Sequence, residues 1–98
     1  MTIKTFHPNG LLTATISASA ASSSTALDQF SDAVRIQNKG PNEVFIQFGN
    51  SAVAATTAHM PIASGATETF TKGPLTHVAA ICGAGETATV RFTCGEGL

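Results

Sequence analysis

The sequence contains no tryptophan and no tyrosine, and only 11% of its 98 residues are charged, against about 25% in ordinary globular domains. Six phenylalanines are therefore the only aromatic rings that could stack on sugars or bases. Five Lys and Arg against six Asp and Glu give a net charge of −1, which offers no electrostatic footprint for a phosphate backbone. These shortages argue against nucleic acid as a partner and make a carbohydrate-binding role unusual.

Long apolar runs are also missing. No stretch approaches the roughly 20 apolar residues that a membrane span requires. Residues 1–12 contain Pro8 and Gly10 and lack the apolar run of about 7 to 15 residues found in a signal peptide. We therefore expect neither a membrane partner nor a signal peptide.

The sequence has two cysteines, Cys82 and Cys94. If residues 83–86 close a hairpin between 76–82 and 87–94, Cys82 lies opposite Thr87 and Cys94 lies opposite Leu75. At ~3.3 Å per residue this register separates the two cysteines by more than ~20 Å, beyond the ~7 Å Cα limit for a disulfide. The sequence thus predicts two unpaired thiols, which suit a reducing cytoplasm.

Residue patterns for catalysis or metal binding are scarce. His7, His59 and His77 do not approach each other or a cysteine at the spacing of metal ligands. No serine stands in a nucleophile-elbow sequence, and the GxG of Gly83 and Gly85 lacks the third glycine of a dinucleotide-binding loop. We expect no catalytic residue, no metal and no cofactor, so the chain is predicted not to be an enzyme.

Strict alternation of apolar and polar residues is the dominant pattern, and it indicates half-buried strands. The turn-forming run 38–42 separates two such segments and predicts a hairpin. Residues 18–27, rich in small side chains, suit a loop or an edge strand, and the proline in 51–65 suits an edge. The predicted strands are residues 11–17, 33–37, 43–48, 66–71, 76–82 and 87–94.

The number and spacing of these segments define the expected architecture. Six to eight short strands without a helical apolar stripe predict an all-β fold, a small antiparallel β-sandwich or jelly-roll-like barrel. We expect one such domain over residues 11–98, because a chain of this length has room for one core. Residues 1–10 would then form an extended N-terminal arm.

Phe45 is a candidate contact residue. In the strand 43–48, Val44, Ile46 and Phe48 share one face, which places Phe45 on the opposite face. Phe45 could meet a partner there, or a loop of the same domain could cover it.

The N-terminal segment supplies the other candidates, Ile3, Phe6 and His7. Ile3 and Phe6 alternate with polar residues, and Pro8 separates them from the first clear strand. Burying each apolar side chain is worth about 1.5 to 3 kcal/mol, so both are expected to pack on something. They could add an edge strand to the chain's own sheet or form an arm that lies on a neighbouring subunit.

Residues 33–98 resemble a group of small proteins encoded among the head and structural genes of tailed bacteriophages. The similarity is carried by the segments VRIQN, FIQFG, SAVAATT, MPIASGATETF, THVAAI and GEGL. The resemblance implies a virion component, made in the host bacterial cytoplasm, that decorates or cements the head. It also implies assembly as a dimer or trimer on the major capsid protein or another virion protein.

A second function remains open from the sequence alone. A host-recognition or glycan-binding module at a fibre or tail tip could use the same kind of sandwich. The missing tryptophan and tyrosine favour the capsid-binding function over this alternative.

Overall fold

The computed structural model describes residues 7–8, 13–28 and 31–96. This part of the chain has nine β-strands, and it has no helix that could cross a membrane. The strands are β1 (His7–Pro8), β2 (Ala14–Ala18), β3 (Ser23–Ala26), β4 (Ala33–Pro41), β5 (Val44–Gly49), β6 (Met60–Ile62), β7 (Thr67–Thr71), β8 (His77–Ile81) and β9 (Ala88–Glu96).

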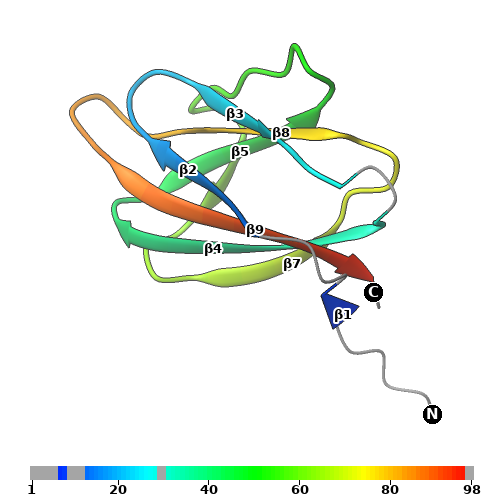
Figure 1. Ribbon diagram of the computed structural model, residues 1–98. Helices are drawn as coiled ribbons and strands as arrows, with labels where there is room; N and C mark the ends of the chain where they lie inside the picture. The colour runs from blue at the N-terminus through cyan, green and yellow to red at the C-terminus, as the bar shows by residue number, and fades with distance from the viewer. Residues whose placement is uncertain (1–6, 9–12, 29–30, 97–98) are drawn as a thin grey trace.

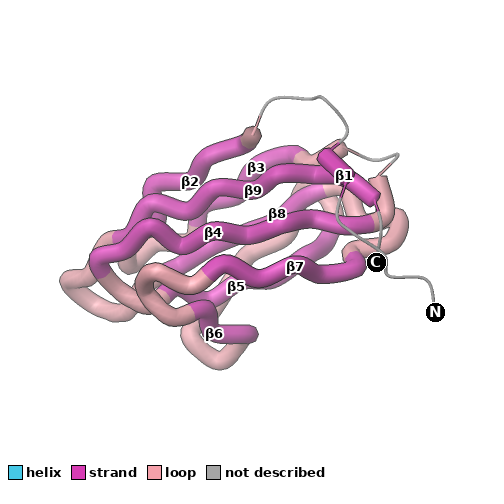
Figure 2. The backbone as a smooth tube through the Cα atoms, turned by 90° about the horizontal axis from the view of Figure 1, so that it is seen from below, coloured by secondary structure: helices cyan, strands magenta, loops and turns pink. Residues whose placement is uncertain are grey.

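The strands form two antiparallel sheets that pack face to face (Figure 1). Sheet A has the order β2-β9-β4-β7, and β1 pairs with the far end of β9 on the same edge as β2. Sheet B has the order β3-β8-β5-β6. Figure 2 shows the sheet A strands side by side, with sheet B behind them.

The pairing is nested. β2 pairs with β9, β3 with β8, β4 with β7 and β5 with β6, so the chain folds as one long hairpin that is rolled into two layers. Lateral pairing of β4 with β9 and of β5 with β8 completes the sheets. This arrangement is that of a jelly roll, so the predicted all-β sandwich is confirmed.

Alternate residues of the strands fill the space between the sheets. Val34 and Ile36 of β4 face Val44 and Ile46 of β5 within one apolar cluster, and each is at most 1% exposed. The rings of Phe48 on β5 and Phe70 on the edge strand β7 meet across the sandwich with centroids 6.4 Å apart. Burial of these side chains is the main force that holds the layers together.

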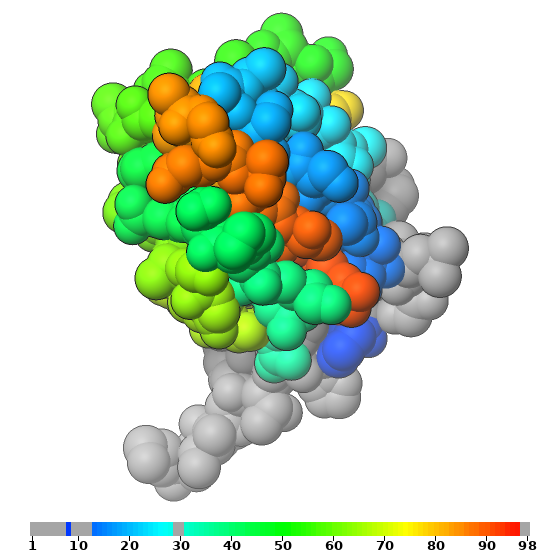
Figure 3. All heavy atoms as spheres, turned by 90° about the vertical axis from the view of Figure 1, so that its left-hand side faces the viewer, coloured from blue at the N-terminus to red at the C-terminus, as the bar shows by residue number. Residues whose placement is uncertain are grey.

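Both predicted hairpins are wrong, although their strands are confirmed. β4 and β5 lie in different sheets, and so do β8 and β9. The connections 42–43 and 82–87 cross from one layer to the other, together with 19–22 and 63–66, and all four gather at one end of the sandwich (Figure 3). Turn residues indicate that a chain reverses, and they do not show whether it stays in the same sheet.

The thiol prediction holds in spite of this error. Cys82 and Cys94 are both unpaired and buried. Cys94 lies opposite Val34 of β4 and not opposite Leu75. The Cys82 N–H donates to the carbonyl of Ser19, next to Ala18, which is opposite Ala88. Because Cys94 is six residues further along β9, the two thiols lie ~20 Å apart along the strand direction.

The weaker sequence segments contain edge strands. The run 18–27 includes β3, at the edge of sheet B, and 51–65 includes the short edge strand β6 with Pro61 at its centre. Both outcomes match the expectation that small residues and proline favour edges.

Asn38 is a fully buried polar residue in the second half of β4, where the pairing with β9 becomes irregular. Its side-chain amide donates to the carbonyls of Asn42 (2.9 Å) and Ile62 (3.0 Å), and its Oδ1 accepts a hydrogen bond from the Gly40 N–H (2.8 Å). Its backbone N–H and carbonyl pair with Ala66 and Gly65. One residue of sheet A therefore holds the β4–β5 crossing, strand β6 of sheet B and the β6–β7 connection.

We expect Asn38→Ala to lower the free energy of unfolding by about 3 kcal/mol or more, because three backbone groups lose their hydrogen-bond partner. Urea unfolding at a common m-value measures the change. Asn42→Ala is the matched control, since Asn42 contributes its backbone carbonyl to this network, and it should shift stability by less than about 0.5 kcal/mol. Similar losses in the two variants would contradict the role given to Asn38.

Candidate functional site

The outer face of sheet A is a broad polar surface formed by four strands. In β2, β4 and β9 the residues between the core positions point outward, as the alternation of burial shows, and the outward positions of β7 follow from its pairing with β4. Threonine dominates these positions, because a β-branched hydroxyl side chain suits a strand that faces water. The outward residues of strands β2, β9, β4 and β7 are Thr15, Ser17, Thr89, Arg91, Thr93, Arg35, Gln37, Lys39, Thr67, Thr69 and Thr71.

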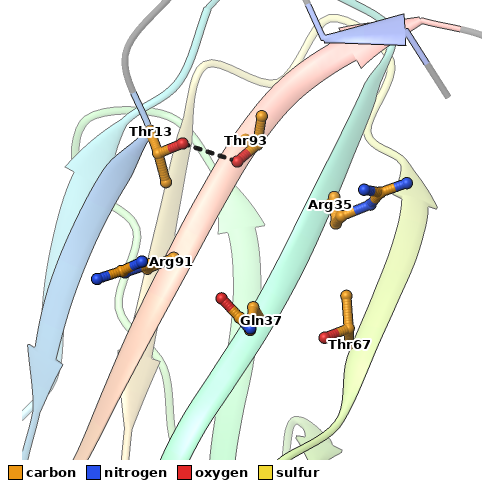
Figure 4. Close-up of a pocket in the computed structure, with 6 residues that line it drawn as sticks. All are labelled: Thr13, Arg35, Gln37, Thr67, Arg91 and Thr93. Carbon is orange, nitrogen blue, oxygen red and sulfur yellow. Dashed lines mark hydrogen bonds between the residues drawn. The ribbon is translucent and has the colours of Figure 1, made fainter.

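A hollow of about 380 Å³ lies on this face. All of its lining residues are polar: Thr13, Arg35, Gln37, Thr67, Arg91 and Thr93. Figure 4 shows Gln37 between the two arginines, with Arg91 on the β2 side and Arg35 on the β7 side.

Strand register explains why these residues meet. Arg91 of β9 lies directly opposite Gln37 of β4, and Gln37 lies opposite Thr67 of β7. Arg35 lies opposite Thr93 in the adjacent row, and the hydroxyl groups of Thr93 and Thr13 are hydrogen bonded at 2.9 Å (Figure 4). The hollow thus depends on three strands that are far apart in the sequence.

Charge is segregated between this face and the rest of the molecule. Within the described residues the exposed basic side chains are Arg35, Lys39 and Arg91, and all three point outward from sheet A. Lys72 is buried, and its ammonium group donates to the carbonyls of Gly73 (3.3 Å) and Leu75 (3.0 Å). The carboxylates lie in connections, at a strand end, or on the edge strand β7: Asp28, Asp32, Glu43, Glu68, Glu86 and Glu96. The outer face of sheet A is therefore cationic although the net charge of the chain is −1.

The outer face of sheet B is partly covered by the chain itself. Residues 50–59, which connect β5 and β6, fold back over it (Figure 1). The Ala55 N–H donates to Ser22 Oγ at 2.9 Å, and the outward-facing Ala79 is 0% exposed. Sheet A, by contrast, presents its polar side chains to solvent.

The sequence correctly predicted the direction of Phe45. Its side chain is half-buried on the outer face of sheet B, opposite to the buried Val44 and Ile46. Pro61 of β6 and Ile81 of β8 are its neighbours in the sheet. A partner contact at Phe45 stays a prediction.

The N-terminal candidates are only partly covered by the structure. Ile3 and Phe6 lie outside the described residues. His7 belongs to β1, where it is opposite Glu96 of β9. At His7–Pro8 the chain therefore forms an edge strand of its own sheet, as one of the two sequence interpretations proposed.

The hollow was not among the candidates drawn from the sequence. Alternation in 87–94 places Arg91 with Thr89 and Thr93 on one polar face, and alternation in 33–37 places Arg35 with Gln37. The missing information was that β4 and β9 are neighbours, which local patterns do not show.

The remaining histidines have local roles. His59 Nδ1 accepts a hydrogen bond from the Thr56 N–H at 2.9 Å, and His77 Nδ1 shares a hydrogen bond with the Thr76 hydroxyl at 2.8 Å. Over residues 7–8, 13–28 and 31–96, no group of three or more His, Cys, Asp or Glu side chains could hold a metal ion.

Comparison with known proteins adds a likeness in fold. No protein-family model matches the chain, and a search of curated proteins finds no match. A solved structure of Bacillus endospore appendages, described as a novel family of disulfide-linked pili, matches with a TM-score of 0.54. The match covers 89% of this chain and 84% of the appendage chain at 22% identity. The two proteins share a fold, and the matched protein belongs to an appendage and not to a phage head.

Cys82 gives a pH-dependent prediction. Burial raises the pKa of its thiol, and the nearby Glu86 carboxylate raises that pKa further. Above about pH 8.5 an unfolded thiol ionises while the folded one keeps its proton, so the unfolded state gains stability as pH rises.

The free energy of unfolding should therefore decrease more steeply in the wild type than in Cys82→Ala as the pH increases from 8 to 10, measured by urea titrations. Cys94→Ala is the control, because it keeps Cys82 and should keep its contribution. Parallel pH profiles for the wild type and Cys82→Ala would contradict the assigned pKa direction.

Proposed function

We propose that this protein is a structural subunit that works by binding other protein chains, as a component that decorates or stabilises a tailed-phage particle. The open outer face of sheet A carries this proposal. It spans four strands and presents threonine, glutamine and arginine side chains, groups that form hydrogen bonds and ion pairs across protein interfaces. The resemblance of residues 33–98 to small tailed-phage structural proteins supports the identity of the particle.

The side of the sandwich formed by the edge strands β7 and β6 favours contacts through faces over added strands. On the edge strand β7, Glu68 lies opposite the buried Ile36, at an inward-facing position of the strand. The other edge strand on this side, β6, has only three residues and contains Pro61, which lacks an N–H. Charged inward positions, prolines and short edge strands all hinder pairing with another chain.

The shared fold with an appendage protein gives independent support for an assembled structural role. That protein forms pili. A jelly roll can serve many functions, so the likeness supports assembly in general and not a particular partner. In this proposal the protein performs no catalysis.

A glycan-binding role receives less support. The hollow offers hydroxyl, amide and guanidinium groups, but its six lining residues include no aromatic ring. Rings that pack on the apolar faces of sugars supply much of the affinity at carbohydrate sites. The hollow therefore fits a charged protein surface better than a neutral sugar.

Electron microscopy of particles whose genome encodes this chain tests the proposed function. We expect density for the jelly roll on the particle, and its loss from particles produced without the chain. Addition of purified protein should restore it. Intact particles that contain no such density, and to which the purified protein does not bind, would refute the proposal.

The N-terminal segment gives a further test of assembly. If Ile3 and Phe6 contact a neighbouring subunit, deletion of residues 1–6 should leave the melting temperature nearly unchanged but prevent oligomer formation or particle binding. Sedimentation velocity and co-sedimentation with particles measure these effects. An Ile3→Ser, Phe6→Ser double variant is the full-length control and should behave like the deletion. Undiminished assembly of both variants would show that these side chains make no such contact.

A further inference from the structure

The two arginines of the sheet A hollow are placed to act on a common ligand surface. Arg91 and Arg35 lie on adjacent strands and are offset by one pair of residues, since Arg91 is opposite Gln37 and Arg35 is opposite Thr93. Diagonal neighbours of this kind are about 7–8 Å apart at the backbone, and Figure 4 shows the Arg91 side chain extending toward β2 and the Arg35 side chain toward β7. Gln37 separates the two side chains (Figure 4).

The chemistry of the hollow selects anions. Guanidinium groups bind carboxylate and phosphate with paired hydrogen bonds, and the threonine hydroxyls and the Gln37 amide supply further donors. Lys39, two residues beyond Gln37 on β4, extends the positive charge along the same face. Among the described residues, no carboxylate occupies an outward position of sheet A.

We propose that this hollow binds carboxylate groups on an acidic surface of the protein with which the chain assembles. This inference rests on the proposed function for the statement that the ligand is a protein. It specifies that the contacted surface of the partner is acidic and that Arg35, Gln37 and Arg91 contact that surface.

Charge and shape favour a protein over other anions. A nucleic acid would need a longer series of cations than the three on this face, and single strands are held largely by aromatic stacking. The hollow is lined by hydroxyl, amide and guanidinium groups without aromatic rings. A few carboxylates on a flat surface match the two arginines of the hollow and Lys39 on the same face.

The same charges argue against a second copy bound face to face. In a two-fold symmetric contact through sheet A, the arginine-bearing surfaces would oppose each other. Like charges placed against each other across an interface are unfavourable by several kcal/mol. The surface that covers sheet A must therefore differ from sheet A itself.

Two glutamine substitutions provide a matched test. Gln37→Glu places a carboxylate between Arg35 and Arg91, where it would repel an incoming anion and offset the positive charge of the hollow. Gln47→Glu makes the same change in net charge at an exposed position on β5, in the other sheet. Both positions are solvent exposed, so both variants should fold and keep the wild-type melting temperature, which is checked first.

Binding of a fluorescent octaglutamate peptide is followed by anisotropy. We expect binding to the wild type and to Gln47→Glu within about twofold of each other, and at least about tenfold weaker binding to Gln37→Glu. Raising the salt concentration from about 0.05 to 0.5 M should weaken the binding, because exposed charges are screened. Equal affinities of the two variants, or no binding to the wild type, would overturn the inference.

Two comparison ligands and one assembly measurement test the class of partner. Oligogalacturonate presents carboxylates on a sugar, and oligothymidylate presents phosphates. Tighter binding of either than of octaglutamate would overturn the assignment to a protein. Sedimentation velocity of the protein alone should give the same oligomeric state for both variants. Loss of self-association in Gln37→Glu only would assign the surface to a second copy and also overturn the inference.

Particle binding separates the two proposals. If particles bind the wild type and Gln47→Glu but not Gln37→Glu, both proposals are supported. If they bind all three proteins equally, the carboxylate site is refuted and the structural role stands. If no particle binds the wild type while the peptide results hold, the structural role fails and the anion site remains.

Discussion

The buried carboxamide of Asn38 is the contact on which the two-sheet arrangement depends. Its hydrogen bonds join β4 of sheet A to β6 of sheet B and to the turn that carries the chain between the layers. The register between β4 and β9 shifts just beyond Asn38, and the chain turns through Gly40 at a φ of +86°. This φ is one that L side chains rarely adopt, and a Cβ atom at Gly40 would also displace the Ser64 hydroxyl, so the crossing favours glycine. A single buried polar residue with satisfied hydrogen bonds thus helps to fix the arrangement of the apolar core.

The alternation of residues was sufficient to predict the strands and the faces that they bury. Val34 and Ile36, Val44 and Ile46, and Val90 and Phe92 all point inward as expected. What alternation does not contain is the identity of the neighbouring strand. Both Asn38–Asn42 and Gly83–Glu86 look like hairpin turns, yet each joins strands in opposite sheets. In a jelly roll the partner of a strand is set by long-range closure of the core, which no local pattern encodes.

The same limit applies to the candidate site. The sequence places Arg91 on a polar face with Thr89 and Thr93, and this placement is confirmed. It gives no sign that Arg35, more than fifty positions earlier, lies on the adjacent strand. The net charge was therefore a poor guide to the surface, because it sums carboxylates in connections and at edges with cations that are gathered on one face. Phe45, in contrast, could be assigned from its own strand, since its direction depends only on its immediate neighbours.

The register between β4 and β9 determines both the core and the hollow. On β4, Val34 and Ile36 point inward while Arg35 and Gln37 point outward, and on β9, Val90 and Phe92 alternate with Arg91 and Thr93. A slip of one residue would turn both arginines into the core and expose the large apolar side chains, so burial excludes it strongly. A slip of two residues would keep the core apolar, but Arg91 would no longer lie opposite Gln37 and the lining of the hollow would change. The irregular pairing after Asn38 opposes that second slip, because the extra residue of β4 between Asn38 and Pro41 fits one alignment with β9. The irregularity in the β4–β9 pairing therefore begins at Asn38, the residue whose side chain also links sheet A to β6 of sheet B.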